Sequence, residues 1–273
     1  MAESMQRVDN FRGKGRHYDH PVTGHKMPSV TNVLDVISKP ALIPWAAKVE
    51  RELCVGTANR VYSSLGDEHV APDEFAKRLD IALPRQKAHR TVSKGAINIG
   101  NEAHKLIEWR LRGELGLERG PEPEASEPAL WAVAGFEDWR REVDLKPTHT
   151  EERLYSDDLD AAGSTDVLAA EMDTYILAPK KRRISICGDW KTSAKCYPEM
   201  DIQVATYRHM AIERGILPED AWGVVLRLPK TLEDGGKFEA RLVPPSRCKV
   251  LVEVFRAARR IWQWQSDDKE TRR

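Results

Sequence analysis

The hydrophobic pattern changes about half-way along the chain. Before residue 143, apolar positions recur every three or four residues, as in "TVSKGAINIGNEAHKLIEWRLRG" (residues 91–113), which predicts helices. After it come "EERLYS", "GSTDVLAAE" and "RRISICGDWKT", which are short, alternate or contain β-branched residues, and are separated by polar turns. The pattern therefore predicts a helical first half followed by a β-rich core.

Further elements flank this core. "RHYDHPVTGHKMPSVTNVLDVIS" near the start predicts an extended pair and then a helix capped by Ser29 or Thr31. Pro198 opens another helix, "AWGVVLRL" and "KFEARLV" form a strand pair, and residues 246–265 predict an amphipathic closing helix. The order of elements indicates an α/β fold, and no Rossmann or P-loop glycine signature is present.

The order and composition of these segments predict three regions. Residues 1–93 are expected to form a mainly helical region packed on the core, residues 94–265 the core itself, and residues 266–273 a charged tail. We find no internal repeat and no long low-complexity segment.

Composition restricts the function classes. The 273 residues are 41% hydrophobic, enough for a sizeable core, and 43 basic side chains balance 43 acidic ones. A chain without net charge has no long-range field that attracts nucleic acid or membrane, so such binding must come from local patches. No apolar run approaches the ~18 residues of a membrane span, and "MAESMQRVDNFRGKGR" lacks a signal segment. We therefore expect no membrane association and a cytoplasmic location, in the bacterial host cell if the protein is phage-encoded.

The four cysteines are widely separated and form no CxxC pair: Cys54, Cys187, Cys196 and Cys248. This spacing argues against a zinc module or a disulfide framework and favours reduced, structural thiols.

The candidate chemistry lies at the ends of two predicted strands. In "ISICGDWKTS", alternation places Asp189 and Lys191 on one side of the strand and Trp190 on the other. In the preceding strand, Gly163 permits a close backbone approach and Asp166 begins an apolar run. The alternative is a structural Asp–Lys ion pair and an unrelated turn aspartate.

Two carboxylates and one ammonium at a common point suit phosphodiester hydrolysis. Oxygen ligands are those that Mg²⁺ or Mn²⁺ prefers, and such ions take part of their coordination shell from substrate phosphates. A neighbouring lysine holds a phosphate and stabilises the charge that develops as water attacks.

Two helices carry further candidates. Gln203 and Tyr207 are four residues apart after the strand of Asp189, so one helix face presents both to the site edge. His104 lies on the apolar stripe of its helix, where a neutral imidazole can bind a metal ion. An ordinary polar–aromatic pair and a hydrogen-bonded core histidine are the alternatives.

Taken in order, these motifs resemble the PD-(D/E)xK nuclease superfamily in its RecB-like exonuclease branch, which includes phage-encoded exonucleases. The matching residues are His104 in "GNEAHKLIE", Glu151 or Glu152 in "TEERLYS", Asp166 in "GSTD", Asp189 and Lys191 in "DWKTS", and Gln203 and Tyr207 in "QVATY". The resemblance implies a restriction-endonuclease-like core, in which helices flank a central mixed β-sheet.

The resemblance also implies roles for these residues. Asp166 and Asp189 would bind Mg²⁺ or Mn²⁺, with the Trp190 carbonyl completing the shell and His104 as the ligand typical of the exonuclease branch. Lys191 would position or activate the attacking water. Gln203 and Tyr207 would support the site and touch DNA.

The family glutamate is ambiguous in this sequence. Spacing to the next apolar residue favours Glu151, whereas strand alternation puts Glu152 on the face of Leu154. We assign Glu151 a catalytic role. Members with an iron–sulfur cluster need four grouped cysteine ligands, which this chain lacks, so no cluster is expected.

DNA is the expected partner. "PKKRRIS" places Lys181 and Arg182 at the turn before the catalytic strand, where they can contact phosphates, although a solvated hairpin tip would look the same. We expect a metal-dependent exonuclease on DNA with free ends, in phage or bacterial replication, recombination or repair. The alternatives are a structure-specific or nicking endonuclease on the same fold and an inactive DNA-binding subunit. A recombination or single-strand-binding protein is a candidate partner.

Overall fold

The computed structural model describes residues 5–11, 15–37, 39, 42–174, 182–231 and 237–271. Contacts within the chain divide it into two units, one of Met1–Ile37 with Ile99–Arg273 and one of Ser38–Asn98. These limits differ from the boundary expected at residue 93, because the first 37 residues belong with the sheet and not with the helices that follow them.

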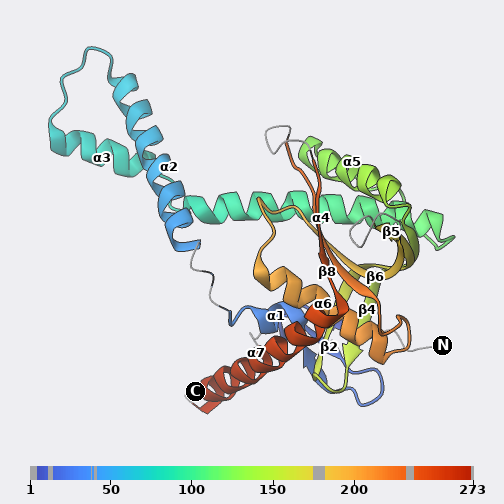
Figure 1. Ribbon diagram of the computed structural model, residues 1–273. Coiled ribbons are helices and arrows are strands. Elements are labelled where there is room, and N and C mark those ends of the chain that lie inside the picture. The colour runs from blue at the N-terminus through green and yellow to red at the C-terminus, as the bar shows by residue number, and fades with distance from the viewer. Residues whose placement is uncertain are drawn as a thin grey trace. The chain divides into compact units, whose positions relative to one another are not determined.

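A mixed β-sheet forms the centre of the larger unit (Figure 1). Its five described strands lie in the order β4, β5, β6, β7 and β8, with bounds Lys146–Ser156, Ala161–Thr174, Arg182–Lys191, Trp222–Arg227 and Glu239–Val243. Among these five described strands, β6 and β7 form the one parallel pair, and helix α6 (Pro198–Glu213) connects them. A crossover helix is what a parallel pair requires.

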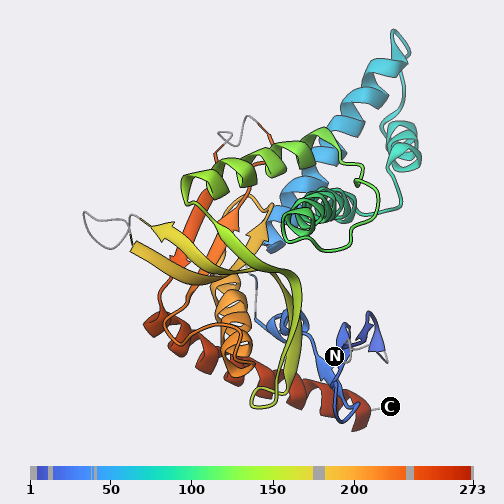
Figure 2. The ribbon, with the colours of Figure 1, turned by 90° about the vertical axis from the view of Figure 1, so that its right-hand side faces the viewer.

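Helices cover both faces of the sheet (Figure 2). Helices α4 (Ala88–Glu114) and α5 (Glu127–Glu142) share one hydrophobic cluster with the sheet, and α1 (Val30–Leu34), α6 and α7 (Pro245–Thr271) share the other. Alternation along β6 supplies both clusters, since Ile186 belongs to the first and Cys187 to the second. The predicted mixed sheet flanked by helices is therefore confirmed.

The N-terminal segment forms a small sheet of β1 (Arg7–Val8), β2 (His17–Asp19) and β3 (Lys26–Pro28), and then α1. The extended pair predicted here corresponds to β2 and β3. Ser29 caps α1, because its hydroxyl accepts a hydrogen bond from the Asn32 N–H at 3.1 Å. Of the two predicted caps, the structure selects Ser29.

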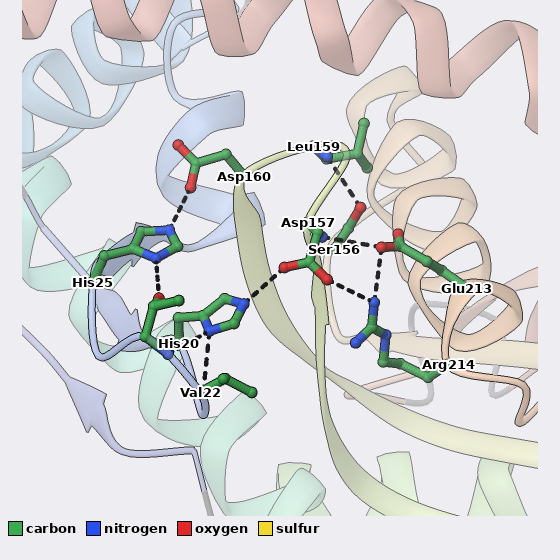
Figure 3. A network of polar contacts seen from close by, with 10 residues as sticks. His20, Val22, His25, Ser156, Asp157, Leu159, Asp160, Glu213 and Arg214 are labelled. Carbon is green, nitrogen blue, oxygen red and sulfur yellow. Dashed lines mark hydrogen bonds and ion pairs between the residues drawn. The ribbon is translucent and has the colours of Figure 1, made fainter.

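Two histidines of this segment hold the turn between β4 and β5 (Figure 3). His20 Nε2 donates to Asp157 Oδ1 at 2.7 Å, and His25 Nε2 to Asp160 Oδ1 at 2.9 Å. Arg214 at the end of α6 donates to the other oxygen of Asp157 at 3.0 Å. These contacts fix the N-terminal hairpin to the sheet.

The other ring nitrogen of His20 determines its tautomer. His20 Nδ1 accepts hydrogen bonds from the backbone N–H groups of Val22 and Thr23, each at 3.1 Å. The hydrogen therefore lies on Nε2, where it is donated to Asp157.

The smaller unit contains α2 (Leu42–Leu65), α3 (Pro72–Ala82) and the first turns of α4. Polar contacts join its segments: Arg78 pairs with Glu68 at 3.0 Å, and His89 with Glu50 at 2.7 Å. In the described part of the chain, no helix combines the length and the apolar character needed to cross a membrane. At the other end, α7 continues through Thr271 and so includes most of the predicted charged tail.

Candidate metal centre

Three acidic residues lie side by side on three neighbouring strands. The β4–β5 register pairs Thr150 with Val167 and Glu152 with Thr165, which leaves Glu151 opposite Asp166. The β5–β6 ladder ends where Val167 pairs with Gly188, so Asp166 and Asp189 occupy the next position on each strand. Adjoining strands thus bring together three carboxyl groups that are far apart in the sequence.

Where the backbone pairing of β5 and β6 ends, side chains form the hydrogen bonds between the two strands. Thr165 Oγ1 donates to the Gly188 carbonyl at 2.9 Å, and the Trp190 N–H donates to Asp166 Oδ2. On the other side, Thr150 Oγ1 donates to the Asp166 carbonyl at 3.1 Å. These bonds satisfy the buried backbone groups and hold the Asp166 carboxylate in one orientation.

Glu151 has an unusual backbone conformation for a residue within a strand. Its φ of 49° lies in the left-handed region, which costs a residue with a Cβ roughly 1–3 kcal/mol. Ser164 Oγ donates to Glu151 Oε2 at 3.2 Å and so helps to hold the side chain. Strain of this kind is concentrated at functional sites, and here it falls on an acid of the cluster.

His104 reaches the same point from α4. Ala103, Ile107 and Leu111 bury one side of this helix, and His104 Nδ1 donates to Asp166 Oδ1 at 3.0 Å. One ligand atom each from His104, Glu151 and Asp166 lies within 4.8 Å of the others. Among the described residues, this is the group of side chains that could hold a metal ion. Two carboxylates and an imidazole form a donor set that suits Mn²⁺ and also accommodates Mg²⁺.

Asp189 is not a member of this three-residue group, and other side chains contact both of its carboxylate oxygens. Lys191 Nζ forms an ion pair with Oδ2, and Gln203 Nε2 donates to Oδ1 at 3.2 Å. Asp189 Oδ2 is buried and has no hydrogen bond beside this ion pair, so it retains the capacity to bind a cation. The predicted same-side placement of Asp189 and Lys191 is confirmed.

Gln203 and Tyr207, the two residues of α6 predicted to face the site, do so. Gln203 Nε2 donates to the Tyr207 hydroxyl at 3.2 Å as well as to Asp189. Tyr207 in turn lies against Gly163, where an added Cβ would be 2.4 Å from the Tyr207 ring. The close approach expected at Gly163 is therefore confirmed, and Gln203 links Asp189 to Tyr207.

Charge and burial shift the titration of the whole cluster. Burial lowers the pKa of His104, but the charge of Asp166 and its hydrogen bond prevail and raise the pKa to about 9. Burial, with the charge of Asp166, raises the pKa of Glu151 to about 8, and burial raises the pKa of Asp189 to about 6 against the opposing effect of Lys191. At Asp166, burial raises the pKa, but the charge and hydrogen bond of His104 outweigh it, so the pKa of Asp166 is lowered. Near neutral pH, the cluster therefore keeps a proton on Glu151 and on His104.

These shifts predict that the metal-free protein loses stability as pH rises from about 6 to 9. The folded-state pKa values of Glu151 and His104 exceed the ordinary 4.5 and 6.5, so the folded state binds more protons than the unfolded state in this range. Each such proton lowers the free energy of unfolding by up to about 1.4 kcal/mol per pH unit. Thermal melts in EDTA at several pH values measure the slope.

Two comparisons test the origin of this slope. Glu151→Gln should reduce it and Glu152→Gln should leave it unchanged, because only the first side chain belongs to the cluster. Mn²⁺ should oppose the loss at high pH, since a metal ion competes with protons for the same ligands. A flat profile in EDTA would show that the cluster does not hold these protons.

Trp190 and the two basic residues of the turn do not place a side chain in the cluster as the structure describes them. The Trp190 ring is buried on the opposite side of β6 from Asp189, with ring centres 5.0 Å from Phe136 and 5.6 Å from Trp139. The backbone N–H of Trp190 donates to Asp166, and a ligand role for the Trp190 carbonyl stays a prediction.

Lys181 lies outside the described residues, and so does the side chain of Arg182, whose backbone begins β6.

Sequence reasoning missed several supporting residues. Thr150, Ser164 and Thr165 hold the acids through hydrogen bonds, but single hydroxyl residues in strands carry no distinctive signal. Glu108 was detectable, since it follows His104 by four residues on the same helix face. Its charge helps to raise the pKa of Glu151, after burial and the charge of Asp166, whereas the charge of His104 lowers this pKa.

A cavity of about 420 Å³ lies along the same helix. Arg119 stacks over Trp109 with its guanidinium carbon 3.8 Å from the ring centre. The cavity is lined by Lys105, Glu108, Trp109, Arg112, Glu118, Arg119, Gly120, Pro121 and Pro123. Glu108 belongs to this lining, and its charge also helps to raise the pKa of Glu151 in the candidate centre.

Comparison of the sequence with models of known protein families found no match, and a search of curated proteins found none either.

Proposed function

We propose that this protein is a metal-dependent deoxyribonuclease with a restriction-endonuclease-like core, and that it acts as an exonuclease on DNA ends. The observation that supports this most is the row of Glu151, Asp166 and Asp189 on adjoining strands, with Lys191 paired to the last of them. A structural ion pair alone has no need for two further buried carboxyl groups.

His104, Glu151 and Asp166 would hold a Mn²⁺ or Mg²⁺ ion, with Asp189 beside them. A bound divalent cation supplies polarisation of the scissile phosphate and lowers the pKa of water. Lys191 would contact a phosphate oxygen and offset the charge that grows as water attacks phosphorus.

The ion pair with Asp189 supports this role for Lys191. Burial lowers the pKa of Lys191, but the charges of Asp189 and Asp166 prevail and raise it, so the ammonium stays charged. A permanent cation stabilises developing negative charge without a further proton transfer.

The cavity on α4 supports a nucleic-acid substrate. Lys105, Arg112 and Arg119 present cations, and Trp109 an aromatic ring, on the helix that carries His104. Cations that follow a backbone, together with rings on which bases stack, are the usual means of binding single strands. One strand of a DNA end could pass along this surface.

The test is incubation of the purified protein with Mn²⁺ and two substrates, a linear duplex and a covalently closed circle. We expect progressive loss of the linear DNA, an intact circle, and no reaction in EDTA. Cleavage of the circle would favour the endonuclease alternative. Binding in a gel shift without cleavage of either substrate would favour a DNA-binding subunit.

Variants show whether the proposed residues carry the reaction. Asp189→Ala and Lys191→Ala should each abolish the loss of linear DNA, with folding checked by circular dichroism. Cleavage by both variants at the wild-type rate would overturn the proposal.

A further inference from the structure

Helix α7 carries a second apolar stripe on the side that faces solvent. The stripe consists of Val250, Val254, Ala257, Ile261 and Trp264, which we call the outer seam. The exposed fractions of Val250, Val254, Ile261 and Trp264 are 52%, 42%, 47% and 66%, and Ala257 is also exposed. The spacing alternates between four and three residues throughout, which is the heptad spacing of a helix that pairs with another helix.

The opposite side of α7 is already used for packing. Cys248, Leu251, Val252, Phe255 and Ala258 are buried in the cluster between the helix and the sheet. Figure 2 shows α7 along the face of the sheet away from α4 and α5. A surface helix needs one apolar stripe to face its own core, and the outer seam is a second stripe that the hydrophobic clusters of the described residues do not include.

Charges beside the outer seam indicate which partner it fits. Glu253 and Arg260 immediately precede Val254 and Ile261, so they occupy the same heptad position, seven residues apart and with opposite signs. Side chains at this position face each other when two helices pair in antiparallel directions. Two copies of α7 would then form two ion pairs, each between Glu253 of one copy and Arg260 of the other.

The same register matches the rest of the outer seam. It sets Val254 of one copy against Ala257 of the other, and Val250 against Ile261. Trp264 meets Arg247, which is exposed at the start of α7 and can stack on the indole as a cation on a ring.

A parallel pair would lack this complementarity. Glu253 and Arg260 would then face the positions of Ala258 and Gln265, and Ala258 is buried in its own core. Among the described residues, Glu253 forms a surface ion pair with Arg256 at 3.1 Å, and the side chain of Glu253 is 71% exposed. Such an exposed pair is weak and leaves Glu253 available to a partner.

We propose that the protein forms a two-fold symmetric dimer through the outer seam, with the two α7 helices antiparallel. The contact is isologous, since each copy presents the same patch to the other. The proposal does not depend on the nuclease function.

The test is sedimentation equilibrium of the full-length protein over a wide range of concentration. We expect a reversible monomer–dimer equilibrium for the wild type and a monomer for Ile261→Glu. Glu253→Arg and Arg260→Glu should each raise the dissociation constant about tenfold, because each reverses two ion pairs. Lys249→Glu is the matched control, since it changes an exposed charge on α7 outside the seam.

Mixing the two charge variants gives the decisive result. Glu253→Arg and Arg260→Glu together restore both opposite-charge pairs between unlike chains, so a heterodimer should form with about the wild-type affinity. A monomeric wild type would overturn the proposal, and so would a dimer that neither charge variant weakens. Failure of the mixture to recover would overturn the antiparallel register.

Discussion

Glu151→Gln is expected to lower DNA cleavage by about 10²–10⁴-fold, whereas Glu152→Gln leaves it within about twofold. The two residues are neighbours in one strand, but only Glu151 lies within 4.8 Å of the ligand atoms of His104 and Asp166. The initial rate on linear DNA with Mn²⁺, measured for both variants and the wild type, checks the prediction. Equal rates for the two variants would remove Glu151 from the site.

Stability separates this effect from unfolding. Burial and the charge of Asp166 raise the pKa of Glu151 to about 8, so the side chain is neutral at pH 7 in the metal-free protein. Glutamine is neutral too, and we expect the melting temperature in EDTA to stay the same or rise. Loss of cleavage together with an unchanged or higher melting temperature would show that Glu151 serves function and not stability.

Gly163→Ala should destabilise the protein by about 1–3 kcal/mol, the usual cost of overpacking a core. The new Cβ would lie 2.4 Å from Tyr207 Cε1 and 3.1 Å from its hydroxyl oxygen. Because strand β5 holds the backbone of Gly163, the ring must move, and its hydrogen bond with Gln203 is disturbed. Urea unfolding measures the stability change, and cleavage should fall as well.

Two controls identify the collision as the cause. Gly95→Ala, at an exposed site in α4 with nothing within 4 Å of the new Cβ, should stabilise the protein by up to about 1 kcal/mol. In a Tyr207→Leu background, which removes Cε1, Gly163→Ala should cost less than in the wild type. An equal cost in both backgrounds would show that Tyr207 is not the obstacle.

Much of the fold follows from local signals. Strands in the second half, a helix opened by Pro198, a helix capped by Ser29, and the alternation of β6 between two apolar faces all appear as periodicity, caps and breakers within a few residues. The lengths of the strands do not, since β4, β5 and β6 have 11, 14 and 10 residues where short strands are expected. Such signals act through neighbouring backbone and alternate side chains, so one sequence suffices to predict them. The placement of Asp189 beside Lys191 and opposite Trp190 follows from strand alternation in the same way.

Local sequence signals do not predict the long-range contacts of the N-terminal hairpin. The sequence predicts a mainly helical region over residues 1–93 and an extended pair near its start, but not that His20 contacts Asp157, 137 positions later, or that His25 contacts Asp160. Nothing within a few residues of either histidine indicates these partners. Only the packed chain determines which segments meet.

The sequence by itself determined the order of the elements, the acidic and basic residues available for chemistry, and the apolar spacing along α7. The tertiary structure decided which glutamate joins the cluster, because the φ of 49° at Glu151 breaks the alternation that would have favoured Glu152. It also decided which stripe of α7 faces the sheet and which faces solvent. The reason is the same in both cases: periodicity fixes the direction of a side chain relative to its own element, while contacts between distant segments fix what that side chain meets.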